Sequence, residues 1–204
     1  MLKKNLLIFI LSLVTLFVQS EMINEIVVTG DWRETSLSDA GSSLALITDD
    51  QIERKQLKHF EDVTYLVPNL NFAASDSRPR YFQIRGIGER SGYEGTPNSS
   101  VGFLIDDIDF SGQGGIASTY DIEQIEIYRG PQGSRMGANA LAGMVYIKTK
   151  DPKDFFQLQG GLTFGDFGRK DIKALINIPF TENIQSRLTI SKEDFDGFRK
   201  NLFF

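Results

Sequence analysis

Hydrophobic and polar positions alternate most strictly towards the C-terminal end of the chain. Three segments, 155–165, 172–178 and 184–191, carry apolar side chains at every second position, and turn residues separate them at 166–171 and 179–183. Since successive side chains of a β-strand point to opposite faces, this period predicts three antiparallel strands, each with one apolar and one polar face. Such strands are typical of a transmembrane β-barrel, and also of a soluble sheet with one solvated face.

The residues before Pro152 follow a mixed pattern. Apolar or β-branched runs predict strands at 43–48, 81–88, 100–110, 121–130 and 144–150, the third being two short strands around a turn at Asp106-Asp107. Thr48-Asp49-Asp50-Gln51 fits a capping box, which predicts a short helix to about Gln56. A second helix is expected from Phe60 to just before Pro68. Together these elements predict a small α+β domain over 44–152.

The N-terminal residues indicate export. Lys3 and Lys4 precede an uncharged apolar run that closes on Val18-Gln19-Ser20, which predicts a secretory signal peptide over 1–20. A membrane anchor is the alternative, but the run is shorter than the ~20 apolar residues that a spanning helix needs. Loss of residues 1–20 removes two lysines and no acid, which shifts the formal net charge from −5 to −7. An acidic chain argues against a nucleic-acid partner.

Residues 21–43 contain one β-branched run, Glu25-Ile26-Val27-Val28-Thr29-Gly30, and are otherwise polar. No neighbouring run offers an obvious partner for a strand there. The segment is either flexible and extended, pairing with another protein, or the ordinary first strand of a sheet. The pattern does not separate these two hypotheses.

Several motifs, in order along the chain, resemble the N-terminal part of TonB-dependent outer-membrane receptors. EIVVTG resembles the energy-coupling TonB box, YFQIRGIG an arginine-glycine motif, and VGFLIDDIDF a strand motif with Asp107 where glycine is usual. DIEQIEIYRGPQGSRMGANALAGMVYIKTKDP is similar to the most diagnostic block of the plug domain, from which it departs at Met136 and Met144. INIPFTENIQSRLTISKEDFDGFRKN resembles the first barrel hairpins.

The resemblance implies an α+β plug domain at 44–152, followed at 153–204 by the first antiparallel strands of a transmembrane β-barrel, which has about 22 strands in the family. An open sheet edge leaves backbone groups unpaired in lipid, so we expect the chain to be a fragment or a truncated product. The implied function is TonB-energised uptake of a scarce ligand, such as a ferric siderophore, cobalamin or a glycan, across the outer membrane of a Gram-negative bacterium. The expected partners are therefore TonB, outer-membrane lipid and a small ligand.

The resemblance also implies three groups of site residues. Residues expected to bind TonB by strand addition are Glu25, Ile26, Val27, Val28 and Thr29. Residues expected to contact the barrel wall, where the arginines would pair with carboxylates, are Arg85, Gly86, Arg129 and Gly130. Residues on loops that could meet an anionic ligand are Arg78, Arg80, Arg90 and Tyr93.

Other chemistry receives less support from the sequence. The glycines of GPQGSRMGANALAG suit a backbone packed tightly inside the barrel; a phosphate cradle is the alternative, but no Lys-Ser/Thr follows them. Asp106, Asp107 and Asp109 fit a turn better than a calcium site, because EF-hand spacing is missing. We expect no catalytic residues, no metal and no cofactor, and we expect the single histidine, His59, on the surface.

Two other functions stay open. One is a free periplasmic module in which the plug-like domain binds a ligand without transport, although the three alternating strands argue against it. The other is an exported hydrolase, although the paired carboxylates have no histidine or nucleophile near them in sequence.

Overall fold

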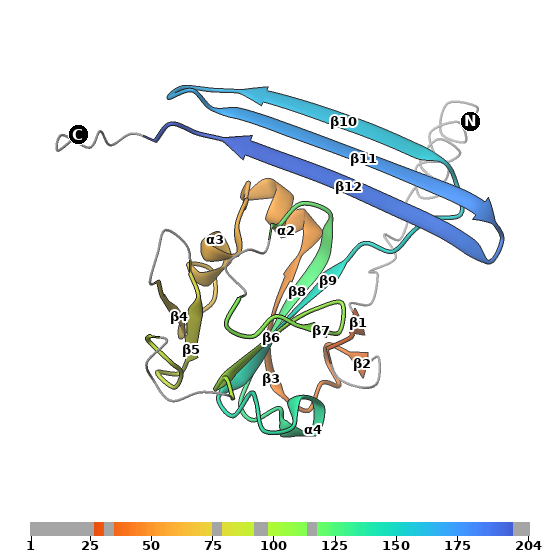
Figure 1. The fold of residues 1–204 in the computed structure, drawn as a ribbon. Helices are drawn as coiled ribbons and strands as arrows, with labels where there is room; N and C mark the ends of the chain where they lie inside the picture. The colour runs from red at the N-terminus through yellow and green to blue at the C-terminus, as the bar shows by residue number, and fades with distance from the viewer. Residues whose placement is uncertain (1–26, 31–34, 75–78, 92–97, 114–117, 198–204) are drawn as a thin grey trace, which may run out of the picture.

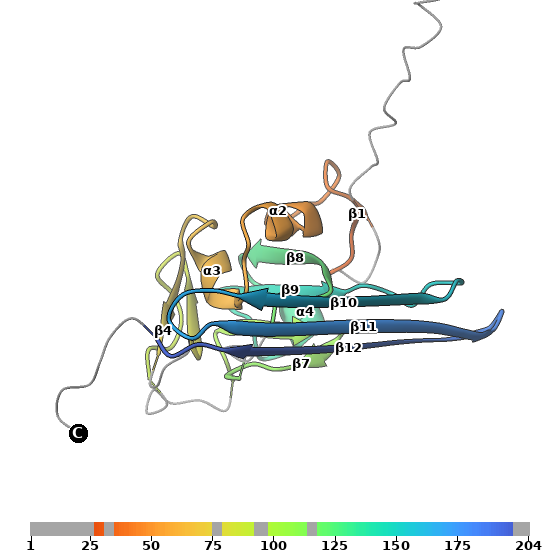
Figure 2. The same cartoon turned by 90° about the horizontal axis from the view of Figure 1, so that it is seen from above.

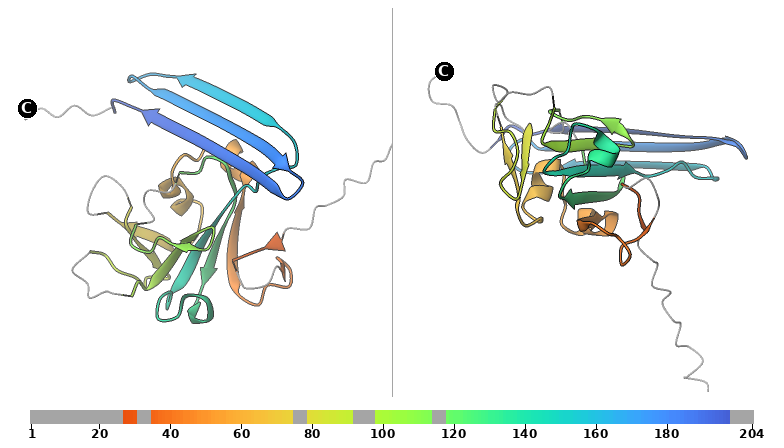
Figure 3. Two further views of the ribbon diagram at one scale, coloured as in Figure 1. Left: turned by 45° about the vertical axis from the view of Figure 1, so that its right-hand side comes forward. Right: turned by 90° about the horizontal axis from the view of Figure 1, so that it is seen from below.

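The computed structural model describes residues 27–30, 35–74, 79–91, 98–113 and 118–197. Two parts can be distinguished (Figure 1): a mixed domain before Pro152, which we call the N-terminal domain, and a three-stranded sheet that lies across one end of it, which we call the C-terminal sheet. Seen from above, the three long strands run side by side over the N-terminal domain (Figure 2). Their far ends extend past it on the side where β1 lies (Figure 3).

The main sheet of the N-terminal domain has five strands in the order β3-β8-β9-β6-β7. Their bounds are Ser43–Thr48 for β3, Ile122–Arg129 for β8, Gly143–Thr149 for β9, Val101–Ile105 for β6 and Ile108–Asp109 for β7. Only the β6/β9 pair is parallel. The sequence pattern predicted each of these strands correctly, including the turn between β6 and β7.

Two smaller strand pairs complete the domain. β4 (Leu70–Ala73) pairs with β5 (Tyr81–Ile84), and β1 (Val27–Val28) pairs with β2 (Thr35–Ser36). The strand predicted over 81–88 ends early, because Arg85 adopts a positive φ of 54° and the chain reverses there. Of the two hypotheses for the N-terminal segment, the structure shows a paired strand at Val27–Val28. Its partner is β2, and the pair is not part of the main sheet.

Three short helices are present among the described residues. They are α2 (Asp49–Arg54), α3 (Phe60–Thr64) and α4 (Gly133–Met136). The predicted capping box of α2 is half confirmed: the Thr48 hydroxyl accepts a hydrogen bond from the backbone N–H of Gln51 at 3.5 Å. α4 was not predicted, because its residues lie within the glycine-rich block.

The expectation that the glycines of the GPQGSRMGANALAG block allow tight backbone packing can be tested at two positions, from the space around each glycine and from its φ angle. A Cβ at Gly143 would overlap the carbonyl oxygen of Tyr128, so tight backbone packing does require glycine there. Gly133 has open space around it and no positive φ, so no such requirement applies.

The core of the N-terminal domain is built around three phenylalanines. Phe60 packs edge-on against Phe82 and Phe103, with ring centroids 5.1 and 4.9 Å apart. Buried side chains of the main sheet, among them Ile125 and Ile147, join this cluster. α3 and β5 are thereby fixed to the main sheet.

The C-terminal sheet consists of β10 (Gln157–Phe164), β11 (Lys170–Thr181) and β12 (Ile184–Asp194), all antiparallel, with β11 in the middle. Its outer face is apolar and exposed, and its large side chains are Leu158, Leu162, Phe164, Ile172, Ile184, Leu188 and Ile190. On the inner face, Asp171, Leu175 and Asn177 are buried. The predicted alternation is confirmed. Among the described residues, no helix is long and apolar enough to cross a membrane.

Candidate functional site

A largely buried ion pair joins the C-terminal sheet to the N-terminal domain. Arg187 of β12 donates from Nε to Oδ2 of Asp121 at 2.7 Å and from a terminal nitrogen to Oδ1 at 2.6 Å. The two side chains are only 6% and 10% exposed. Because both carboxylate oxygens accept a hydrogen bond, the pair fixes the relative orientation of the two side chains and also neutralises their charges. Asp121 immediately precedes β8, so β12 is attached to the start of that strand of the main sheet.

A second contact has the opposite polarity. Lys58 of the N-terminal domain pairs with Asp171 of β11, which also accepts from Arg169 Nε at 3.2 Å. Next to it, His59 Nε2 lies 3.5 Å from a carboxylate oxygen of Glu193. His59 is partly exposed, at 34% of its side chain, which agrees with the expected surface position; it stands at the N-cap of α3 and faces β12. The sequence places Asp171, Arg187 and Glu193 on the polar faces of β11 and β12, but it does not indicate their partners.

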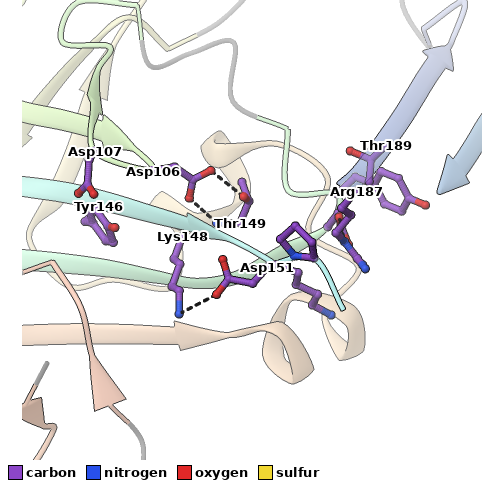
Figure 4. Close-up of a pocket in the computed structure, with 12 residues that line it drawn as sticks. Asp106, Asp107, Tyr146, Lys148, Thr149, Asp151, Arg187 and Thr189 are labelled. Carbon is purple, nitrogen blue, oxygen red and sulfur yellow. Dashed lines mark hydrogen bonds and ion pairs between the residues drawn. The ribbon is translucent and has the colours of Figure 1, made fainter. Parts of the chain in front are cut away.

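Polar cavities lie between the two parts. One, of about 510 Å³, is bordered by the β6–β7 turn, the end of β9 and β12 (Figure 4). In it, Asp106 accepts hydrogen bonds from the backbone N–H of Thr149 at 2.8 Å and from its hydroxyl at 2.6 Å. Asp107 pairs with Arg135. These aspartates thus serve the turn, as their positive φ values of 46° and 70° also indicate.

Two tyrosines near this cavity have perturbed ionisation. Burial, together with the nearby Asp107 carboxylate, raises the pKa of Tyr146 to about 12. Burial and the adjacent Asp121 carboxylate raise the pKa of Tyr120, whose ring also lies 5.0 Å from the ammonium group of Lys173. Both phenols are neutral at physiological pH.

The candidate TonB-binding segment is docked on β8. Val28 is buried, whereas Val27 is exposed and Thr29 is half-buried. The backbone N–H and the hydroxyl of Thr29 donate to Oε1 of Glu126 at 2.8 and 3.0 Å, and the N–H of Gly30 donates to Oε2 at 2.7 Å. Glu25 and Ile26, the first two residues of the candidate segment, lie outside the described residues.

Two further side chains complete this contact. Gln124 donates to Glu126 at 2.6 Å and to the carbonyl oxygen of Val27 at 3.0 Å, and the Tyr128 hydroxyl donates to Glu126 at 2.6 Å. Sequence reasoning missed Glu126. A carboxylate between two isoleucines in a buried strand is a signal that could have found it, because a buried charge needs partners.

The candidate wall-contacting residues gather at the opposite end of the main sheet. Arg85 donates from a terminal nitrogen to the Ser43 hydroxyl at 3.2 Å, and Ser43 is the register partner of Arg129. This end of β3 lies away from the C-terminal sheet (Figure 1). Gly86 and Gly130, which follow the two arginines, have positive φ values of 81° and 121°. The buried Nε of Arg129 has no hydrogen-bond partner among the described residues.

The candidate ligand residues are only partly described. Arg78 and Tyr93 lie outside the described residues. Arg80 and Arg90 are exposed on the segments that flank β5, and Arg80 donates from Nε to the carbonyl oxygen of Gly112 at 3.2 Å. The ligand assignment of all four residues stays a prediction.

Comparison with known protein families shows which family has this arrangement of a mixed domain and an attached sheet. The model of the TonB-dependent receptor plug domain matches residues 36–144. The chain belongs to this family. The resemblance inferred from the sequence motifs is thereby confirmed, and the N-terminal domain corresponds to the plug.

Named relatives of this plug-domain chain are transporters and receptors, not enzymes. It is 25% identical over 182 residues to a vitamin B12 transporter BtuB of Vibrio vulnificus strain YJ016, covering 86% of this chain and 28% of that protein. It is 27% identical over 142 residues to a ferric enterobactin receptor PirA of Pseudomonas aeruginosa, covering 64% of this chain and 19% of that protein. The chain thus spans less than a third of the length of these relatives.

Solved receptors share the fold. The alcaligin outer membrane receptor FauA of Bordetella pertussis matches with a TM-score of 0.67 at 21% identity, over 83% of this chain and 29% of that one. The P. aeruginosa receptor FpvA, solved with a bound iron–pyoverdine complex, matches with a TM-score of 0.68 at 18% identity, over 83% and 22%. These likenesses establish the plug-plus-strands architecture, and with the family they support an outer-membrane location.

Proposed function

We propose that the chain is the N-terminal part of an outer-membrane receptor that takes up a scarce ligand with energy supplied through TonB. In this proposal, residues 1–20 are a signal peptide, 21–43 carry the TonB box, 44–152 form the plug, and 153–204 begin the barrel. The observation that carries it is the C-terminal sheet: its outer face is apolar and exposed, whereas its inner face is attached to the N-terminal domain by the Asp121–Arg187 and Lys58–Asp171 pairs. That division suits lipid outside and a plug inside.

The two arginines at the far end of the main sheet support the same proposal. Arg129 is half-buried and Arg85 is exposed at this end of the sheet, where Ser43 lies between them as the hydrogen-bond acceptor of Arg85 and the register partner of Arg129. A carboxylate on a facing barrel wall would supply a charge partner for the accessible part of these arginines. The plug would then be attached to the wall at both ends of β8.

The ligand class is proposed from the relatives' names. A vitamin B12 transporter and receptors for ferric enterobactin and alcaligin are among the similar proteins. A metal chelate, either cobalamin or a ferric siderophore, is therefore the preferred cargo, and a glycan is the alternative. Arg78, Arg80, Arg90 and Tyr93 are the candidate contacts for an anionic chelate.

The proposal is tested with the complete gene product. Cells that depend on it are grown with iron, cobalamin or a glycan limiting, and uptake of the cargo so identified is measured. Val27→Pro removes a backbone N–H that strand addition by TonB needs, so it should abolish uptake and leave ligand binding intact. Val27→Ala, which keeps that N–H, should transport normally. Normal uptake by Val27→Pro contradicts the assignment of the TonB box.

A free periplasmic module remains the second candidate. It predicts that the complete gene product fractionates with the soluble periplasm. Recovery in the outer-membrane fraction, extracted only by detergent, excludes it.

A further inference from the structure

We propose that Gln124 and Glu126 form an internal latch, which holds the TonB box docked by occupying the same backbone groups that strand addition by TonB needs. The identification of residues 25–30 as the TonB box rests on the proposed function. The contacts that hold residues 27–30 on β8 do not depend on it. It makes docking on β8 and capture by a partner strand mutually exclusive.

One edge of β1 is occupied by side chains of β8 and the other by β2. Residues two apart in a strand direct their backbone groups to the same edge, so the carbonyl of Val27 and the N–H of Thr29 lie on one edge. The opposite edge is paired with β2, where Val28 is the register partner of Thr35. On the free edge, Gln124 Nε2 donates to the Val27 carbonyl and Glu126 Oε1 accepts from the Thr29 N–H. A donor and an acceptor from side chains thus replace the neighbouring strand.

The burial of Glu126 favours the docked position of the box. Its side chain is fully buried and accepts five hydrogen bonds, three of them from Thr29 and Gly30. Hydrogen bonds to a carboxylate are stronger than those between neutral groups, and a buried carboxylate deprived of donors is costly. Release of the box removes three of the five donors, so the closed arrangement is favoured until a competitor or a rearrangement of β8 compensates.

Gly30 gives an independent means of opening the latch. A Cβ built on Gly30 would lie 2.5 Å from a ring carbon of Tyr128 and 2.7 Å from Oε2 of Glu126. Real Cβ atoms do not approach so closely, and the Tyr128 ring is itself buried. Gly30→Ala should therefore displace the box while leaving Glu126 and Gln124 unchanged.

The latch can be tested by thiol labelling at Val28. The chain has no cysteine, and Val28 is 1% exposed in the docked state, so Val28→Cys reports the open fraction of the box. The complete gene product is labelled in outer membranes from cells without TonB. Glu126→Gln loses one of two accepting oxygens and should label at least about tenfold faster, since charge-assisted bonds are lost. The matched control is Glu123→Gln on the same strand, whose carboxylate pairs with Lys148 and not with the box.

The outcomes separate the latch from the proposed function. Faster labelling of both Glu126→Gln and Gly30→Ala than of the control supports the latch. Labelling of Gly30→Ala at the control rate overturns it, including when Glu126→Gln fails to reach the membrane. If both variants label faster but bind the C-terminal domain of TonB no better than the control, the latch stands and the assignment of the TonB box fails.

Discussion

The Asp121–Arg187 pair offers the sharpest test of how the N-terminal domain is attached to the C-terminal sheet. Asp121 has a positive φ of 63°, a backbone conformation that Asn tolerates and Ala does not. Asp121→Asn therefore removes the charge with little backbone strain. It leaves Arg187, whose side chain is 6% exposed, without the carboxylate that it pairs with.

The size of the effect follows from burial. Removing one partner of a buried ion pair costs about 3–5 kcal/mol, whereas an exposed pair within a helix contributes about 0.3–0.5 kcal/mol. The Asn side chain still accepts one hydrogen bond, and the polar cavity of about 510 Å³ beside the pair admits solvent. We therefore expect a loss of about 2–3 kcal/mol in the free energy of opening at the start of β8.

Hydrogen exchange measures this loss directly. In the complete gene product, amides at the start of β8 should exchange roughly 30- to 160-fold faster in Asp121→Asn than in the native protein. Asp50→Asn is the matched control, because its pair with Arg54 is exposed, at 56% and 78% for the two side chains. Arg187→Gln combined with Asp121→Asn should be less than additive. Equal exchange in Asp121→Asn and Asp50→Asn would refute the reasoning that the pair holds β8 to the C-terminal sheet.

Three further predictions concern the N-terminal domain. Gly143→Ala should destabilise it by more than about 2 kcal/mol in denaturant unfolding, since the new Cβ overlaps the backbone carbonyl of Tyr128. Gly133→Ala should be neutral or slightly stabilising. Equal stabilities of the two variants would contradict the close approach of the Gly143 and Tyr128 backbones. Phe60→Ala should cost about 3–5 kcal/mol and exposed Tyr65→Ala less than about 0.5 kcal/mol, and a small loss for Phe60→Ala would show that the aromatic cluster is not the core. Because the folded pKa of Tyr146 is raised to about 12, its contribution to stability is complete below the unfolded value of about 10 and is lost as pH rises through the folded one. Tyr146→Phe should flatten that alkaline decline, and an unchanged decline would show that Tyr146 does not cause it.

Local alternation was enough to predict the strands of both sheets. β3, β8 and β9 and the three strands of the C-terminal sheet were recognised from period two and from the turn residues between them. β4 was missed because Leu70–Ala73 is too short to show a period, and α4 because glycines dominate its block. The motif order carried the family assignment, since no single motif is specific.

The contacts between parts were beyond the reach of sequence. Asp121 and Arg187 stand 66 positions apart, and nothing local to either residue indicates that they meet. The same holds for Glu126 and the box, which are 96 or 97 positions apart and meet only because β1 lies next to β8. Arg85 and Arg129 were recognised as candidates because both end strands beside glycine, but a partner on the wall stays a prediction.

Energy transfer from TonB through the box is tested by a disulfide crosslink in cells between Val27→Cys of the complete gene product and a TonB that carries one cysteine in its box-binding strand. We expect a receptor–TonB adduct, and more of it when Glu126→Gln opens the latch. An outer-membrane product that forms no adduct in either background would contradict the claim that this chain transmits energy from TonB.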